Sequence, residues 1–114
     1  MWSWRRPDTT LVMQSDTDED GTVWRAVRLY GDGSLAVLGH DMGPAVEELF
    51  GCTEYEFART WSKAEAAALR RLLGVPRRGD LLAAVKERFG STDELARFVE
   101  AHGITGTFWN RTGD

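Results

Sequence analysis

The stretch that decides the fold is EYEFARTWSKAE, residues 54–65, in which the hydrophobic period changes. Residues 54–61 alternate, so that every second side chain from Tyr55 to Trp61 points to one face, and this pattern predicts a strand. Residues 62–65 match a capping box, in which the Ser62 hydroxyl and the Glu65 carboxylate bond backbone N–H groups at a helix start. The sequence therefore predicts a strand that leads directly into a helix.

Downstream of this stretch the sequence predicts three helices and one strand. The first helix runs to Leu73 before Gly74, the second from Asp80 to Phe89, and the third from a second capping box at residues 91–94 to Gly103. Residues 104–109 predict a last short strand.

Upstream, residues 9–40 have the character of strands. The apolar run 10–14 predicts a short strand that the acidic stretch 16–21 breaks, and residues 23–30 alternate. Gly31-Asp32-Gly33 predicts a hairpin turn before a third strand over residues 34–38. Residues 44–50 then predict a short helix, with proline at its first position and Gly51 after its end.

The predicted order is β-β-β-α-β-α-α-α-β. It indicates an α+β fold, an antiparallel sheet of about five strands with helices on one face. The chain of 114 residues has the size of one domain, and residues 1–8 are a candidate flexible arm.

The composition excludes several classes of protein. A hydrophobic share of 42% and a net charge of -4 exclude a disordered chain. The single cysteine, Cys52, excludes an internal disulfide and favours a reducing compartment. No apolar run reaches the ~18–20 residues of a membrane span, and residues 1–7 lack the apolar stretch of a signal peptide. We therefore expect a cytoplasmic protein that does not enter a membrane.

Charge is distributed unevenly along the chain. Residues 1–57 hold four basic and eleven acidic side chains, whereas residues 58–114 hold ten basic and seven acidic ones. If the halves stay apart in the fold, a partner meets a dipolar molecule.

An acidic stretch resembles the first half of a calcium loop. Asp16, Asp18 and Asp20 alternate and precede Gly21, as such a loop requires. The twelfth position, which requires a bidentate Glu, is Val27. An acidic, solvated hairpin turn is the favoured interpretation, and no cofactor is expected.

A second candidate site lies where the third strand meets the short helix. His40, Asp41 and Gly43 precede helical N–H groups that attract anions, and histidine titrates near neutral pH. With Cys52 as a nucleophile, the same residues suggest a small hydrolase or ligand binder. The favoured interpretation is a turn, in which Asp41 caps the backbone and His40 closes the hairpin.

The remaining titratable groups point to ordinary structural roles. His102 lies on the apolar side of its helix, which is typical of a core or helix-terminal imidazole. The two histidines and Cys52 are too scattered to predict a zinc site. The acidic pairs at residues 47–48 and at Glu54 and Glu56 serve acid–base chemistry only inside a cleft, and exposure is their usual state.

Two further groups of side chains are candidates for binding a macromolecule. Basic residues in the segment 62–90 have the spacing of phosphate contacts in a helix-turn-helix: Arg70, Arg71, Arg77, Arg78, Lys86 and Arg88. Aromatic and arginine side chains, which anchor protein interfaces, make up the second group: Trp2, Trp4, Arg5, Arg6, Trp24 and Tyr55.

Three motifs carry a resemblance to a known group. They are Gly39-His40-Asp41-Met42-Gly43-Pro44, Glu54-Tyr55-Glu56 and Phe108-Trp109 before Gly113. The chain resembles small uncharacterised bacterial proteins with a Gly-(His/Gln)-Asp-Leu-Gly-Pro turn, a Glu-Tyr-Glu strand and a C-terminal Phe-Trp or Phe-Ser segment. The resemblance spans roughly residues 25–114 and departs at Met42, where Leu is usual. It implies one compact domain and no particular activity.

These observations favour a non-enzymatic module that binds another protein, in the manner of small regulatory or immunity proteins. Nucleic-acid binding through the basic segment 62–90 is the first alternative. A small hydrolase or ligand binder around His40, Asp41 and Cys52 is the second.

Overall fold

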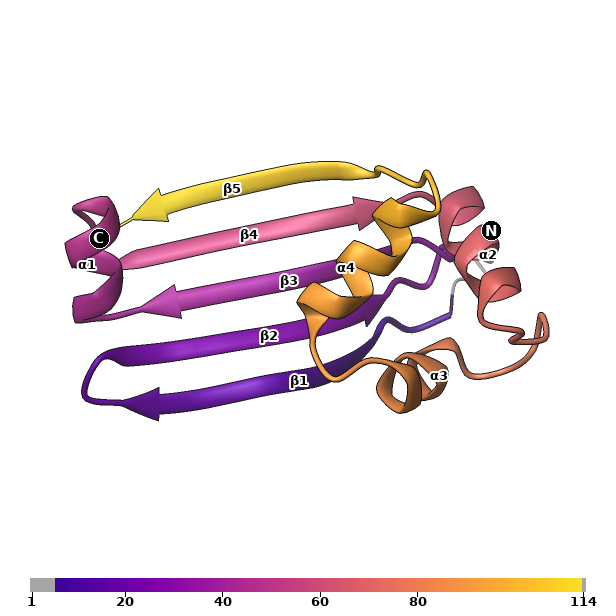
Figure 1. Ribbon diagram of the computed structural model, residues 1–114, viewed down its shortest axis with the longest axis horizontal. Coiled ribbons are helices and arrows are strands. Elements are labelled where there is room, and N and C mark those ends of the chain that lie inside the picture. The colour runs from indigo at the N-terminus through magenta and orange to yellow at the C-terminus, as the bar shows by residue number, and fades with distance from the viewer. Residues whose placement is uncertain (1–5, 114) are drawn as a thin grey trace, which may run out of the picture.

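The computed structural model describes residues 6–113, which form the predicted order of strands and helices (Figure 1). The elements are β1 (Thr9–Asp18), β2 (Gly21–Leu29), β3 (Leu35–Met42), α1 (Pro44–Phe50), β4 (Glu54–Trp61), α2 (Lys63–Leu72), α3 (Leu81–Arg88), α4 (Thr92–Ala101) and β5 (Thr107–Gly113). The α+β class is confirmed.

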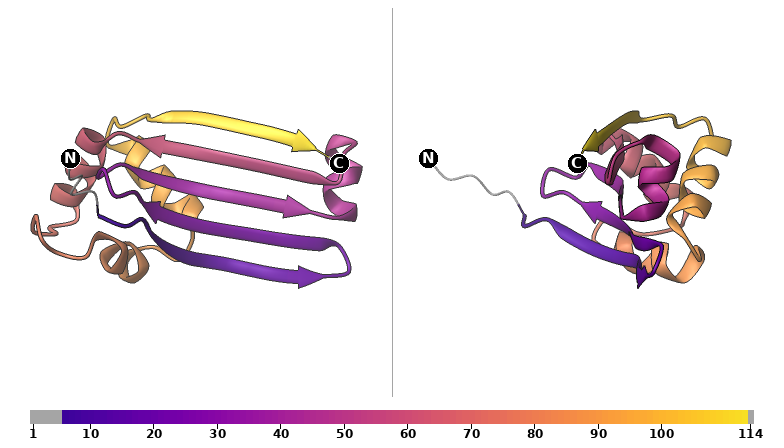
Figure 2. Two further views of the ribbon diagram at one scale, coloured as in Figure 1. Left: turned by 180° about the vertical axis from the view of Figure 1, so that it is seen from behind. Right: turned by 90° about the vertical axis from the view of Figure 1, so that its left-hand side faces the viewer.

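The strands form one antiparallel sheet in the order β1-β2-β3-β4-β5, so each strand pairs with its neighbour in the sequence. Helices α2, α3 and α4 cover one face at one end of the sheet, and α1 lies at the other end (Figure 1). The opposite face carries no helix (Figure 2). We call the covered side the helix face and the bare side the open face.

The core lies between the helix face and the three helices. Alternation along β3 and β4 turns Leu35, Val37 and Trp61 toward α2 and α4, where Leu69 and Leu95 meet them. Trp61 keeps only 1% of its surface exposed. Burial of each such side chain contributes about 1.5–3 kcal/mol to stability. Because these side chains lie where α2, α3 and α4 cover the sheet, that end supplies most of the apolar burial.

Local signals set the ends of the helices. The Ser62 hydroxyl accepts a hydrogen bond from the Glu65 N–H, and the Glu65 carboxylate accepts one from the Ser62 N–H, so the predicted capping box forms. Asp80 caps α3 in the same manner through the Ala83 N–H. Gly51 takes the left-handed conformation after α1, with φ 70°.

Three strands have bounds that differ from the sequence prediction. β1 continues through the acidic stretch to Asp18 because its backbone pairs with β2 down to Gly21, while its carboxylates stay in solvent. β3 runs to Met42 rather than residue 38 because β2 and β4 flank it on both sides. β5 begins at Thr107 and reaches Gly113, since it pairs along the whole of β4. Pairing partners decided these ends.

Asp8 ties the chain before β1 to the sheet. The Asp8 carboxylate accepts a hydrogen bond of 2.7 Å from the Gly31 N–H in the turn between β2 and β3. Residues 1–5 of the expected arm lie outside the described residues.

Close packing joins β2, β3 and β4 in the middle of the helix face. Arg25, Gly39 and Phe57 are cross-strand neighbours. The Phe57 ring occupies the space that a side chain at Gly39 would need, and the Arg25 guanidinium lies 4.9 Å from the centre of that ring. The glycine therefore brings a cation and an aromatic ring together across an intervening strand.

We expect Gly39→Ala to lower the free energy of unfolding by about 1–3 kcal/mol, the usual cost of overpacking. A Cβ at this position would lie 2.0 Å from Cε1 of Phe57. Denaturant unfolding measures the change. Gly113→Ala is the matched control in the same sheet, because its Cβ would lie 4.0 Å from the nearest atom. Equal stability of the two variants would contradict the contact.

Candidate functional site

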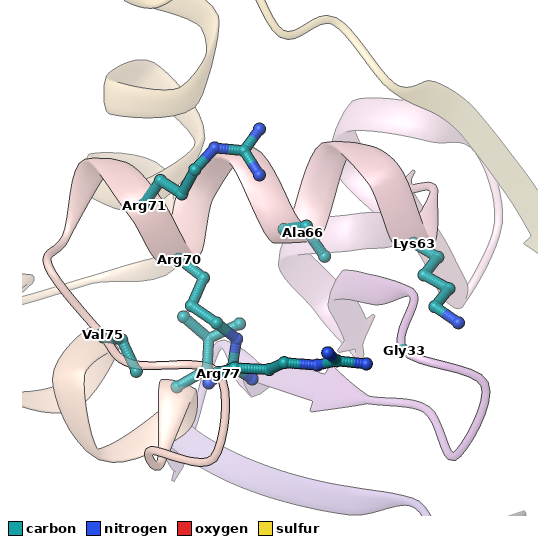
Figure 3. A pocket seen from close by; sticks show the side chains of 9 residues that line it. Gly33, Lys63, Ala66, Arg70, Arg71, Val75 and Arg77 are labelled. Atoms are coloured by element: carbon teal, nitrogen blue, oxygen red, sulfur yellow. The ribbon is translucent and has the colours of Figure 1, made fainter.

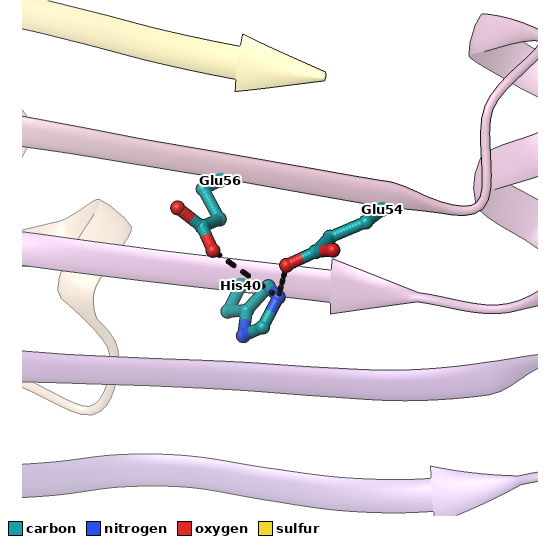
Figure 4. Close-up of side chains that lie close together, drawn as sticks. All are labelled: His40, Glu54 and Glu56. Atoms are coloured by element: carbon teal, nitrogen blue, oxygen red, sulfur yellow. Dashed lines mark hydrogen bonds and ion pairs between the residues drawn. The ribbon is translucent and has the colours of Figure 1, made fainter. Parts of the chain in front are cut away.

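The α1 end of the sheet brings together the motif residues that the sequence singled out. His40 and Asp41 are consecutive in β3, so they point to opposite faces. His40 lies on the open face beside Glu54 and Glu56 of β4 (Figure 4). Asp41 lies on the helix face, where its carboxylate pairs with Arg25. The two faces therefore carry separate sites.

The open face carries a polar cluster of His40, Glu54 and Glu56. His40 Nε2 lies 2.6 Å from Oε1 of Glu54 and 3.6 Å from Oε1 of Glu56. These side chains are 34%, 26% and 29% exposed, so the cluster is partly open to solvent. Arg111 of β5 borders it, with Nη2 3.3 Å from Glu56 Oε1.

Strand register builds this polar cluster. Glu56 is the direct cross-strand neighbour of His40, and Glu54 lies two residues earlier on the same face of β4. The sequence predicted that Glu54 and Glu56 share a face but gave no partner for them. One imidazole nitrogen and two carboxylate oxygens also make up a donor set of the kind that holds a divalent metal ion.

The environment lowers the pKa of Glu54. The main cause is the hydrogen bond from His40, and contact with Glu56 acts in the same direction. Partial burial opposes the shift. The carboxylate of Glu54 is therefore held ionised next to the imidazole.

A shallow hollow of about 210 Å³ adjoins the polar cluster on the open face. His40 and Glu56 line one side of it and Arg28 another. Trp24 and the half-exposed Trp109 also line it. The hollow places indole surface directly beside the charged groups.

The helix face carries a continuous strip of aromatic rings between α1 and β5. We call Phe50, Tyr55, Phe57 and Phe108 the aromatic strip. Successive ring centres lie 4.9, 5.9 and 6.1 Å apart, distances at which aromatic rings attract. Phe50 and Phe108 are 52% and 51% exposed, and neighbouring Leu49 is 76% exposed.

Cations hold the middle of the helix face in place. Arg25 binds both oxygens of Asp41, at 2.6 and 3.1 Å. The Arg59 guanidinium lies 5.2 Å from the centre of the Phe108 ring, and it donates to the Thr105 carbonyl. These contacts order the strip without covering its exposed rings.

The predicted protein-binding residues do not form one patch. Trp24 lies on the open face, because it is aligned with Glu56 across β3. Tyr55 directly precedes Glu56 in β4 and therefore lies on the helix face. Arg6 is exposed ahead of β1. Trp2, Trp4 and Arg5 lie outside the described residues. Phe50 and Phe108 were missed, although their high hydrophobicity at element ends was visible in the sequence.

The turn before α1 does not present free backbone N–H groups of Gly43 and Ala45 to an anion. The Gly43 N–H donates to the Thr53 carbonyl and the Ala45 N–H to the Asp20 carbonyl, so these donors are already used. Asp41 does not cap the turn, because both oxygens of its carboxylate accept hydrogen bonds from Arg25. The expected capping role of Asp41 was wrong because Arg25 binds its carboxylate.

The hydrolase residues are not brought together. His40 and Asp41 face opposite sides of the sheet, and the Cys52 thiol contacts the Glu54 carbonyl at 3.4 Å. No hydrogen bond joins His40 to Asp41 or Cys52 within the described chain. His102 is exposed at the end of α4, where its ring nitrogen lies 2.7 Å from the Phe98 carbonyl.

Part of the basic segment surrounds a pocket of about 370 Å³ between α2 and α3 (Figure 3). Lys63, Arg71 and Arg77 border it, and no carboxylate among residues 6–113 pairs with any of them. Arg70 is engaged instead, because it donates to the carbonyls of Pro76 and Gly79. Three other predicted residues do not line this pocket: Arg78, Lys86 and Arg88.

The calcium-like stretch forms the hairpin between β1 and β2. Asp16 accepts from the Gln14 amide, and Asp18 accepts from the Asp20 N–H. Within the described part of the chain, only the polar cluster gathers three metal-ligating groups, so these aspartates do not converge. An extended hairpin keeps successive carboxylates apart, which explains the difference.

No protein-family model, no curated protein and no solved structure matches this chain. No helix in the described part of the chain has the length and apolar character needed to cross a membrane.

We expect His40→Ala to raise the pKa of Glu54 toward its ordinary value, because the variant removes the hydrogen bond that lowers it most. Titration of the side-chain carboxyl by NMR measures the change. His102→Ala, which alters the other histidine, is expected to leave the titration unchanged. Because the lowered pKa favours the folded protein only where Glu54 is charged, the stabilisation is lost as the pH falls through the carboxyl range. An unshifted Glu54 in the His40 variant would show that the hydrogen bond does not govern its ionisation.

Proposed function

We propose that this protein is a non-enzymatic protein-interaction module of the regulatory or immunity type and that it binds its partner through the aromatic strip. The observation that carries the proposal is the exposure of Leu49, Phe50 and Phe108 beside Tyr55 and Phe57. Aromatic side chains ordered by neighbours are typical anchors of protein interfaces, because they bury a large area at little entropic cost.

The exposed acidic side chains near α1 favour a partner with a basic surface. The aromatic strip runs from Phe108, which pairs with Arg59 of β4, to Phe50 in α1, at the end of the sheet that also carries the turn between β1 and β2 (Figure 1). This end is rich in exposed acidic side chains: Asp16, Asp18, Glu19, Asp20, Glu47 and Glu48. The cations that border the pocket between α2 and α3 lie at the opposite, α2 end of the sheet. A partner with apolar side chains among lysines and arginines complements both properties of this surface.

The same proposal places the protein in the cytoplasm. A single free thiol, Cys52, fits a reducing compartment.

We expect Phe108→Ser to weaken partner binding about tenfold or more, since aromatic anchors are commonly worth about 2 kcal/mol or more. Trp109→Ser is the matched control, because Trp109 is equally exposed, at 52%, but lies on the open face. Quantitative capture with immobilised wild-type and variant chains compares the two, and thermal unfolding confirms that both fold.

The identity of the captured protein also tests the proposal. A basic partner that Trp109→Ser retains and Phe108→Ser loses, with affinity that falls at high salt, is the expected result. Equal loss in both variants would contradict the aromatic strip as the binding surface. Self-association abolished by Phe108→Ser would assign the strip to a second copy of the chain instead.

Nucleic-acid binding is the second candidate function, favoured by cations around the pocket between α2 and α3 that pair with no carboxylate among residues 6–113. Lys63, Arg71 and Arg77 offer phosphate contacts there. We expect any retardation of an RNA or DNA fragment to weaken with salt and to be lost on Arg77→Ala with Arg78→Ala. The control is Glu47→Gln with Glu48→Gln at the opposite end of the molecule. Binding that survives the arginine changes would exclude this segment as the nucleic-acid site.

A further inference from the structure

We propose that the polar cluster of His40, Glu54 and Glu56 is a binding site for one divalent transition-metal ion, with Zn²⁺ as the reference ion. This inference goes beyond the proposed protein interaction and does not rest on it, because the aromatic strip lies on the other face of the sheet.

The positions of the donor atoms suit such an ion. His40 Nε2 and one oxygen of each glutamate all lie within 4.8 Å of one another. Ligands at ~2.0–2.2 Å from a tetrahedral Zn²⁺ are about 3.3–3.6 Å apart. The present separation of 3.6 Å between Nε2 and Glu56 matches this range, and the separation of 2.6 Å between Nε2 and Glu54 is shorter. Small rotations of the side chains are enough to accommodate an ion.

The sheet preorganises these donors. Glu54 and Glu56 alternate on β4, and His40 lies on the adjacent strand β3. Both strands are internal to the sheet, with β2 and β5 outside them. The backbone of the site is therefore fixed by pairing on both sides, and binding orders little beyond the side-chain rotamers.

The donor types select the class of ion. Imidazole suits Zn²⁺, Ni²⁺ and Co²⁺, whereas Ca²⁺ and Mg²⁺ prefer sites made of oxygen alone. The two carboxylates give the site a negative charge, which attracts the cation. The ion takes the place of the contact between His40 Nε2 and Glu54 Oε1, and the imidazole binds it through a ring nitrogen that carries no proton.

Three protein ligands leave a coordination position for a further donor. The hollow beside the cluster is lined by His40, Glu56 and Trp24, and Arg28 also lines it. A small anion with an aromatic or apolar body matches this combination of an open metal position, indole surface and a guanidinium.

Arg111 is the group that opposes metal binding. It interacts with Glu56 at 3.3 Å, and its side chain is 59% exposed. Exposed ion pairs contribute little to stability, so Glu56 can exchange this contact for a metal bond.

Calorimetric titration with Zn²⁺, carried out on the Cys52→Ser chain to remove the thiol, tests the proposal. We expect one ion per chain and an affinity that falls by at least tenfold in His40→Ala, because even the loss of a residue that only orients a metal ligand commonly costs about 10–100-fold in affinity. Co²⁺ provides a second measurement, since the intensity of its visible absorption reports the geometry of its coordination.

Matched variants separate this site from other binding. His102→Ala and Glu48→Gln are expected to bind Zn²⁺ as the parent chain does, whereas Glu54→Gln and Glu56→Gln are expected to weaken binding. Circular dichroism confirms that each variant folds. Unchanged affinity in His40→Ala, or competition by Ca²⁺ at the concentration of Zn²⁺, would overturn the proposal, because the ion would then be held by surface acids alone.

Discussion

The pairing of β3 with β4 is the constraint on which the rest of the structure depends. It places Glu56 opposite His40 on the open face and Phe57 opposite Gly39 on the helix face. The missing side chain at Gly39 admits the Phe57 ring, which in turn meets Arg25. A slip of one residue would exchange the faces of β4, so that Tyr55 would adjoin His40 and both candidate sites would be dispersed.

The helices divide the sheet into parts with different physical roles. At the α2 end, burial around Trp61 supplies the hydrophobic contribution to stability. At the α1 end, helices α2, α3 and α4 do not cover the sheet, which is ordered there by α1, by the stacked rings of Phe50 and Tyr55 and by the Arg25–Asp41 ion pair. Stability therefore comes mainly from one end, which leaves aromatic and charged groups at the other end accessible for binding.

Sequence reasoning succeeded where the signal is local. It located β4 and α1 to the residue and identified the capping box at Ser62, because alternation, proline and caps act over a few positions. It ended β1 too early because acidic side chains were read as a break, whereas pairing with β2 satisfies the backbone there. The same non-local pairing lengthened β3 and displaced β5 toward the C-terminus.

By itself, the sequence determined the class, the order of elements, the faces of β2 and β4, and the separation of acidic from basic segments. It also indicated that Glu54 and Glu56 share a face. Only the tertiary structure decided that His40 joins them, that Asp41 turns away to Arg25, and that rings from α1, β4 and β5 stack in one strip. Periodicity fixes how a side chain points relative to its own strand, but its neighbours depend on register and packing between segments that are distant in the chain.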